Sequence, residues 1–206
     1  MTMNCQQLTV THKQAWHSAT NHPFLLDCRS GNLKPAQFNR WLEQDYLFGI
    51  EFTRFFAATL QAAPPNHFDI LLSGLTGIKA ELCWFHTTAK ERNLSLHNSL
   101  LPACEEYCRF LIALSHRPYP VLATILWGIE NTYSVACRTP IASPYDQLFA
   151  YCASDTFKDY VHQLEQIADE ALTSATEETQ SETEAEFLIM CRHEKAFWQM
   201  AYEAVA

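Results

Sequence analysis

Prolines at two points bound the segment that most constrains the fold. Pro35 suits the first turn of a helix, where its missing N–H is not needed. The pair Pro64–Pro65 ends that helix at the preceding residue. The spacing predicts one continuous helix from Pro35 to Ala63. The chain has only 5 Gly, and no segment shows the two-residue alternation of a half-buried strand. The sequence therefore predicts an all-α fold.

Breakers and caps divide the rest of the chain into further helices. The 206 residues are enough for one sizeable core and no linker separates domains, so we expect a single domain over residues 1–206, a bundle of about eight helices. HPFLLDCRSGN is expected to be a loop, and the acidic segment Thr173–Glu186 an exposed connection. The expected helices span about Leu8–Asn21, Pro35–Ala63, His67–Arg92 and Leu101–Leu114, a fifth that contains Ile125–Cys137, a short one from Ser143–Pro144, then Asp155–Leu172, and a last one that starts at a capping box of Ser181 and Glu184.

Charge and hydropathy exclude several classes of partner. The net charge of -9 argues against nucleic acid or an anionic membrane. No run approaches the ~18 apolar residues of a membrane span, and the polar start MTMNCQQLTVTHKQ does not resemble a signal peptide. The 8 Cys are scattered without CxxC spacing, which is typical of reduced thiols that fill a core. We therefore expect a cytoplasmic protein with neither nucleic acid nor membrane as partner.

Four carboxylates interrupt otherwise apolar helix faces. Residues three and four apart share a face of a helix. Glu130 follows Leu126 and Trp127 by about one turn and precedes Tyr133 by another. A bundle that buries four such faces would aim four carboxylates at one interior. The same pattern surrounds Asp45, Glu81 and Glu194, each on a different predicted helix.

Buried carboxylates need partners, because an unpaired buried charge is costly and tends to become protonated. Lys79 and Lys195 adjoin two of the acids in sequence but point to other faces. The acids must share protons, accept hydrogen bonds from the hydroxyls of Tyr107, Tyr133 and Tyr160, coordinate a metal, or meet a polar ligand. Aromatic walls with a few polar groups describe a small-molecule pocket. The alternative is that each acid lies at the rim of its helix face with its head in water.

Metal and thiol chemistry fit the spacing less well than acid–base hydrolysis. A di-iron site often uses Glu-x-x-His, whereas Glu81 and His86 are five residues apart and point about 140° from each other. Cys137 lies two turns beyond Glu130, but spacing alone does not activate a thiol. No phosphate loop, GxSxG or dinucleotide motif occurs. We expect neither a metal nor a cofactor, and paired carboxylates that activate water and protonate a leaving group.

The chain resembles the TenA, or thiaminase II-like, family, which has the haem-oxygenase-like all-helical fold. The resemblance covers nearly the whole chain, and the WLEQDY and E..FW.MAY pieces are its most specific parts. Because this fold hosts many functions, the site must carry the functional inference. The matching motifs, in order, are HPFLLDCRSGNL, FNRWLEQDYLF, ELCWF, CEEYCRFL, WGIENTY, FKDYV and EKAFWQMAY.

The resemblance implies roles for individual residues. The family binds an aminopyrimidine, the pyrimidine half of thiamine, which would be the small-molecule partner. On the matching motifs, Asp45 would hydrogen-bond the pyrimidine and its amino group, Phe48 would lie against the ring, Tyr107 would reach a ring nitrogen, Tyr133 and Tyr160 would orient the acids, and Glu194 would be the acid–base residue.

One motif departs from the better-known subclass, which has a catalytic Cys in a pattern like Pro-Cys-x-Trp-x-Tyr. This chain has ATILWGIENTY in that region, and Glu130 is the nearest polar replacement. It thus resembles the Cys-lacking subclass, which is implicated in the salvage of degraded thiamine. That subclass removes the formyl group from a formylaminomethylpyrimidine and then the amine, which gives hydroxymethylpyrimidine. Cys137 is expected to be a bystander.

We therefore expect a hydrolase of amino- or formylaminopyrimidines in thiamine salvage. Asp45 would anchor the ring, Glu130 and Glu194 would divide water activation and protonation of the leaving nitrogen, and Glu81 would support or replace one of them. Two other interpretations stay open: a non-catalytic pyrimidine-binding or regulatory protein of the same fold, and a di-iron or cofactor-free oxidase. The resemblance also implies a homodimer or larger homo-oligomer.

Overall fold

The helix predicted from Pro35 is α4, Pro35–Ala62, in the computed structural model of the chain. The side chain of Gln37 accepts a hydrogen bond of 2.9 Å from the backbone N–H of Lys34 at its start. The structure describes residues 3–136, 145, 150 and 152–204. These residues form α-helices, one short 3-10 helix and no strand, which confirms the all-α fold. The elements are α1 (Cys5–Thr11), α2 (Lys13–Thr20), α3 (Pro23–Ser30), α4, η1 (Pro65–His67), α5 (Phe68–Glu91), α6 (Pro102–Leu114), α7 (Tyr119–Ala136), α9 (Asp155–Thr173) and α10 (Glu177–Tyr202).

The N-terminal part of the chain is more helical than predicted. The segment predicted as the first helix forms two helices, α1 and α2, because the backbone of His12 leaves helical geometry at φ -103° and ψ 36°. The expected loop HPFLLDCRSGN contains α3. Its start is capped by His22, whose ring Nδ1 accepts a hydrogen bond of 3.1 Å from the N–H of Phe24, with Pro23 in the first turn. Gly31 ends α3 in the left-handed region at φ 74°, where glycine is favoured.

The last helix begins earlier than predicted. Thr176 caps α10, and its hydroxyl oxygen accepts a hydrogen bond of 3.2 Å from the N–H of Thr179. The capping box expected at Ser181 and Glu184 is therefore wrong, since both residues lie inside the helix. Most of the acidic segment predicted as a connection is helical for the same reason.

The region before α9 is only partly described. Ser154, rather than Asp155, caps α9, because its hydroxyl accepts a hydrogen bond of 3.1 Å from the N–H of Phe157. The short helix expected from Ser143–Pro144 lies outside the described residues, and so does Cys137.

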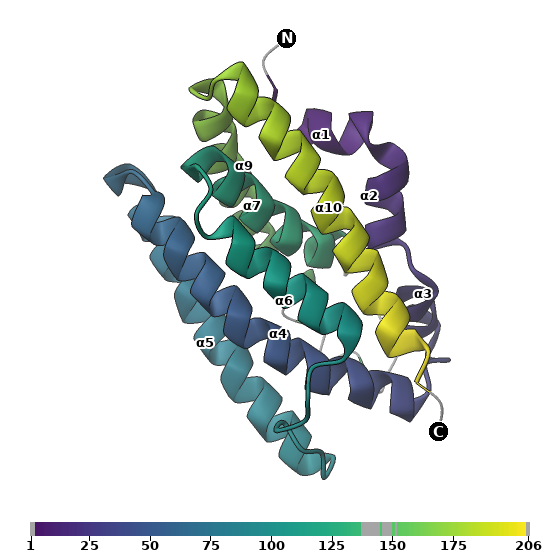
Figure 1. The fold of residues 1–206 in the computed structure, drawn as a ribbon. Helices are drawn as coiled ribbons and strands as arrows, with labels where there is room; N and C mark the ends of the chain where they lie inside the picture. The colour runs from purple at the N-terminus through teal and green to yellow at the C-terminus, as the bar shows by residue number, and fades with distance from the viewer. Residues whose placement is uncertain (1–2, 137–144, 146–149, 151, 205–206) are drawn as a thin grey trace.

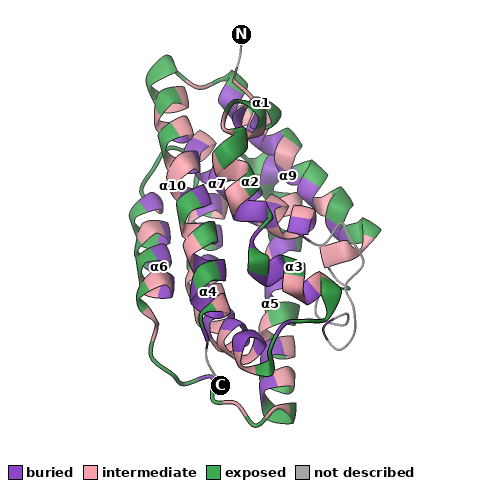
Figure 2. Ribbon diagram, turned by 90° about the vertical axis from the view of Figure 1, so that its right-hand side faces the viewer, coloured by how far each residue is buried: buried purple, intermediate pink, exposed green. Residues whose placement is uncertain are grey.

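Helix α7 lies at the centre of the bundle. Every residue from Val121 to Ile129 is buried, as expected for a helix that is apolar on all sides. It packs against α9 and α10 and also contacts α4 and α2; Figure 1 shows α10 running diagonally across the bundle, with α4, α5 and α6 next to one another. Buried residues face inward and exposed ones outward in Figure 2. In the described part of the chain, no helix has the length and apolar character needed to cross a membrane.

Candidate active site

A cavity of about 110 Å³ opens between α4, α5, α7 and the start of α9. Pockets for drug-sized ligands measure roughly 300 to 1,000 Å³, so this one suits a single small ring. Three of the four predicted acids are on its wall: Asp45 from α4, Glu81 from α5 and Glu130 from α7. Its described lining residues include neither Lys, Arg nor His. They are Asp45, Phe48, Gly49, Phe52, Ser73, Gly74, Gly77, Ile78, Glu81, Phe85, Ile129, Glu130, Tyr133, Cys152, Thr156, Phe157 and Tyr160.

Burial differs among the four acids. Asp45 is 5% exposed and Glu194 2% exposed, so for these two the interpretation as rim residues in water is wrong. Glu130 is half-buried. Glu81 is exposed, so the prediction that it is buried is wrong, although it lines the cavity and the protein around it desolvates its carboxyl. Lys79 and Lys195 are exposed, as their positions on other helix faces predicted.

Asp45 is held by a phenol. The hydroxyl of Tyr133 donates a hydrogen bond of 2.8 Å to Asp45 Oδ1. Burial raises the pKa of Asp45 well above its ordinary value, and the charges of Glu81 and Glu194 raise it further, whereas the hydrogen bond from Tyr133 lowers it. Burial therefore favours the protonated form of the Asp45 carboxyl.

Glu130 and Glu81 form a second, electrostatically coupled pair on the wall. Burial raises the pKa of Glu130 to about 8, with a further contribution from the charge of Glu81 and an opposing one from the hydroxyl of Tyr160. That hydroxyl donates a long hydrogen bond of 3.5 Å to Glu130 Oε1. Burial also raises the pKa of Glu81 to about 7. Both pKa values lie near neutral pH, where general acids and bases work best.

Glu194 lies outside the cavity lining, in a buried pair with Tyr107. The Tyr107 hydroxyl donates a hydrogen bond of 2.7 Å to Glu194 Oε1. Burial raises the pKa of this carboxyl to about 8, against the effect of the Tyr107 hydrogen bond. The charge of Glu194 acts on Asp45, so the pair belongs to the same electrostatic system as the cavity.

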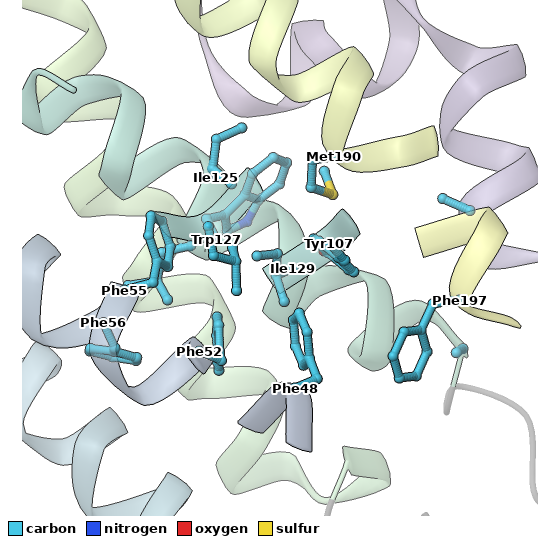
Figure 3. Packing of buried hydrophobic residues seen from close by; sticks show 14 of the residues in the cluster. Phe48, Phe52, Phe55, Phe56, Tyr107, Ile125, Trp127, Ile129, Met190 and Phe197 are labelled. Carbon is cyan, nitrogen blue, oxygen red and sulfur yellow. The ribbon is translucent and has the colours of Figure 1, made fainter. Parts of the chain in front are cut away.

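Aromatic rings connect the wall of the cavity to the Glu194 pair. Phe48 lines the cavity, and its ring centroid lies 4.6 Å from that of Tyr107 and 5.7 Å from that of Phe197. Figure 3 shows the side chains of Phe48 and Phe52 from α4 and of Ile129 from α7 in this region of the core. The apolar side of the cavity can therefore hold the faces of a flat ring.

Sequence reasoning missed six small or polar lining residues, one of which is Gly49 of α4. On α5, Ser73, Gly74 and Gly77 form a face with small side chains or none. Two glycines in a helix interior were a usable signal, because glycine there lowers helix stability unless space is needed. Before and within the first turn of α9, Cys152 and Thr156 also face the cavity.

The described residues do not assemble a metal site. Within residues 3–136 and 152–204, no group of three or more His, Cys, Asp and Glu side chains is placed to hold a metal ion. His86, considered with Glu81 for a di-iron site, instead lies 3.1 Å from the hydroxyl of Tyr46, measured at Nε2. The acids surround a space instead of meeting at a point, which leaves room for a ligand with hydrogen-bond donors between them.

Comparisons with known proteins agree with this architecture. A sequence model of the TENA/THI-4/PQQC family matches residues 10–204. The chain is 29% identical to the "Probable bifunctional TENA-E protein" of Glycine max, over 92% of this chain and 89% of that one. It is 27% identical to the aminopyrimidine aminohydrolase of Halalkalibacterium halodurans, over 91% and 90% of the two chains. The structure of a TenA homologue from Pyrococcus furiosus superimposes with a TM-score of 0.92 at 24% identity, covering 97% of this chain and 100% of that one.

Proposed function

The chain belongs to the TENA/THI-4/PQQC family, and on that premise we propose that it hydrolyses aminopyrimidine or formylaminopyrimidine breakdown products of thiamine. The product would be hydroxymethylpyrimidine for thiamine salvage. The observation that carries the proposal is the set of carboxyls with raised pKa around one small aromatic cavity. The name of the aminopyrimidine aminohydrolase relative supports the substrate class.

Two hydrolytic steps are consistent with this site. In the first, water adds to the formamide, and R-CH₂-NH-CHO gives R-CH₂-NH₂ and formic acid. In the second, water replaces the amine, and R-CH₂-NH₂ with H₂O gives R-CH₂-OH and ammonia. Each step needs a base that activates water and an acid that protonates the leaving nitrogen. Because Glu81 and Glu130 have pKa values of about 7 and 8, a mixture of ionised and protonated carboxyls is available near neutral pH.

Asp45 is suited to anchor the ring. A protonated carboxyl presents one O–H donor and one acceptor oxygen side by side. An aminopyrimidine presents the complement, a ring nitrogen that accepts and an exocyclic amino group that donates. Burial favours the protonated form of Asp45, and the hydrogen bond from Tyr133 fixes the orientation of its carboxyl. The cavity of about 110 Å³ favours a one-ring pyrimidine over intact two-ring thiamine.

We assign the proton transfers to the two glutamates that line the cavity. Activation of water and protonation of the leaving nitrogen are divided between Glu130 and Glu81. Glu194 was expected to share this work, but it lies outside the lining and acts through its charge on Asp45. Because the resemblance puts the thiol of the better-known subclass in the region of Glu130, we propose that the chain belongs to the Cys-lacking subclass of the family.

Turnover of formylaminomethyl- and aminomethylpyrimidine tests the proposal. Chelator-treated protein is incubated with each compound in ¹⁸O-water, and the products are followed by mass spectrometry. We expect ¹⁸O in the hydroxymethyl product, with ammonium released. Glu130→Gln should lower kcat/KM by about 100-fold or more without loss of helical content, whereas the exposed Glu178→Gln is the matched control.

Other outcomes of the same assay refute the proposal. Binding of hydroxymethylpyrimidine without turnover of either substrate would indicate a binding protein. Stoichiometric iron in the purified protein, with oxidation of the pyrimidine, would indicate an oxidase.

A further inference from the structure

Gly74 occupies a point where the candidate site has no room for a side chain. It is buried in the interior of α5 and lines the cavity. A Cβ atom built at this position would lie 2.3 Å from the hydroxyl oxygen of Tyr160 and 2.4 Å from Cζ of Phe56. Real Cβ atoms essentially never approach other heavy atoms so closely, so a side chain at this position must displace both the ring of Tyr160 and that of Phe56.

The ring of Tyr160 links Gly74 to the chemistry of the cavity. Tyr160 comes from α9, and its hydroxyl lies against the bare backbone of α5 while it donates to Glu130 Oε1 on α7. Since that hydrogen bond is already 3.5 Å long, a small displacement of the phenol changes its length and strength. Phe56 is fully buried in the core and has less freedom to move than Tyr160, which is half-buried at the cavity.

We propose that Gly74 is a positioning residue of the active site, which seats the Tyr160 hydroxyl against Glu130 and so sets the protonation of that acid. The predicted effect on the pH profile of kcat rests on the proposed function, whereas the predicted effect on the position of Tyr160 and the titration of Glu130 does not. Glycine in a helix interior lowers helix stability relative to alanine, so its presence in α5 needs a compensating reason, and room for Tyr160 supplies it.

The sign of the effect follows from the surroundings of Glu130. The hydrogen bond from Tyr160 lowers the pKa of Glu130, against burial and the charge of Glu81. Losing the bond therefore raises that pKa further. The titratable groups that share the cavity with Glu130 are Asp45 of α4, Glu81 of α5, Tyr133 of α7, Cys152 before α9 and Tyr160 within it.

The pH dependence of Gly74→Ala and Tyr160→Phe tests the inference. In Tyr160→Phe, the limb of the pH profile of kcat that belongs to Glu130 should move upward by roughly half a pH unit or more, because the hydrogen bond is lost. In Gly74→Ala, the same limb should move by a comparable amount, because the phenol no longer keeps its distance from Glu130. The carboxyl band of Glu130 in infrared difference spectra of the free protein, identified with Glu130→Gln, should show the same shifts. In the Tyr160→Phe background, adding Gly74→Ala should cause no further shift.

Controls separate positioning from stability. Gly128→Ala also crowds a buried neighbour, Met190, but lies outside the cavity lining, so it should lower stability without moving the pH profile. If Gly74→Ala does not fold, Gly74→Ala/Phe56→Leu removes the second clash and keeps the one with Tyr160. An unmoved Glu130 titration in Tyr160→Phe or in the folded Gly74 variant overturns the inference. If the titration of Glu130 shifts but the protein turns over neither pyrimidine, the role of Gly74 is supported and the proposed function is refuted.

Discussion

Glu194 allows the energetic effect of burial on these acids to be measured, because its side chain is only 2% exposed. Burial raises its pKa in the folded protein to about 8, whereas the unfolded chain leaves it near the ordinary 4.5. Below the lower value the carboxyl is protonated in both states. Between the two values the unfolded chain releases the proton while the folded protein retains it, so stability falls as pH rises through this window and levels off above it.

The size of this loss follows from the same two values. Each pKa unit corresponds to about 1.36 kcal/mol, so the difference between 4.5 and about 8 amounts to about 5 kcal/mol as an upper bound. Glu194→Gln cannot ionise and keeps an oxygen that accepts from Tyr107. The variant should therefore gain stability relative to the natural chain as pH rises from about 4.5 to about 9, by at least about 2 kcal/mol.

Urea unfolding followed by circular dichroism at a series of pH values measures this difference. Glu178→Gln, an exposed acid on the same helix, is the matched control and should follow the natural chain at every pH. Stability curves of Glu194→Gln and the natural chain that run parallel across the whole range would refute the claim that burial raises the pKa of Glu194.

Two further substitutions test the site and the fold. Tyr133→Phe removes the 2.8 Å hydrogen bond to Asp45 and with it the orientation of the ring anchor, so calorimetry should show affinity for aminomethylpyrimidine reduced by about tenfold; unchanged affinity would exclude Asp45–Tyr133 from ligand binding. Ser154→Ala removes the cap of α9 and should cost about 1 kcal/mol in urea unfolding, and an unaltered midpoint and slope would show that the cap contributes nothing.

Helix boundaries were predictable where proline or glycine chemistry dictates them and less so elsewhere. Pro35 and Pro64 bound α4 as predicted, because proline restricts the backbone whatever surrounds it. The start of α3 was missed because its cap is the ring of His22, which also lies 2.9 Å from the side chain of Gln199, measured between Nε2 and Oε1. Histidine is not among the preferred capping residues, and this contact with α10 exists only in the folded chain.

The candidate site was predictable in its chemistry but not in its layout. Apolar neighbours at helical spacing predicted the burial of Asp45 and Glu194, since burial of a helix face follows from its periodicity, but Glu81 is exposed. That Glu81 lines the cavity while Glu194 pairs with Tyr107 depends on how helices distant in sequence pack together. The contribution of Gly74 depends on the same packing, because its importance lies in the ring of Tyr160 from another helix.

A crystal structure with the aminopyrimidine product bound would show whether the carboxyl-lined cavity is the site of hydrolysis. We expect the ring in the cavity with one face against Phe48, its ring nitrogen and amino group on the carboxyl of Asp45, and its hydroxymethyl group within hydrogen-bond distance of Glu130 or Glu81. A ring bound elsewhere, or one in the cavity with its hydroxymethyl group out of reach of every carboxyl, would contradict the proposed function.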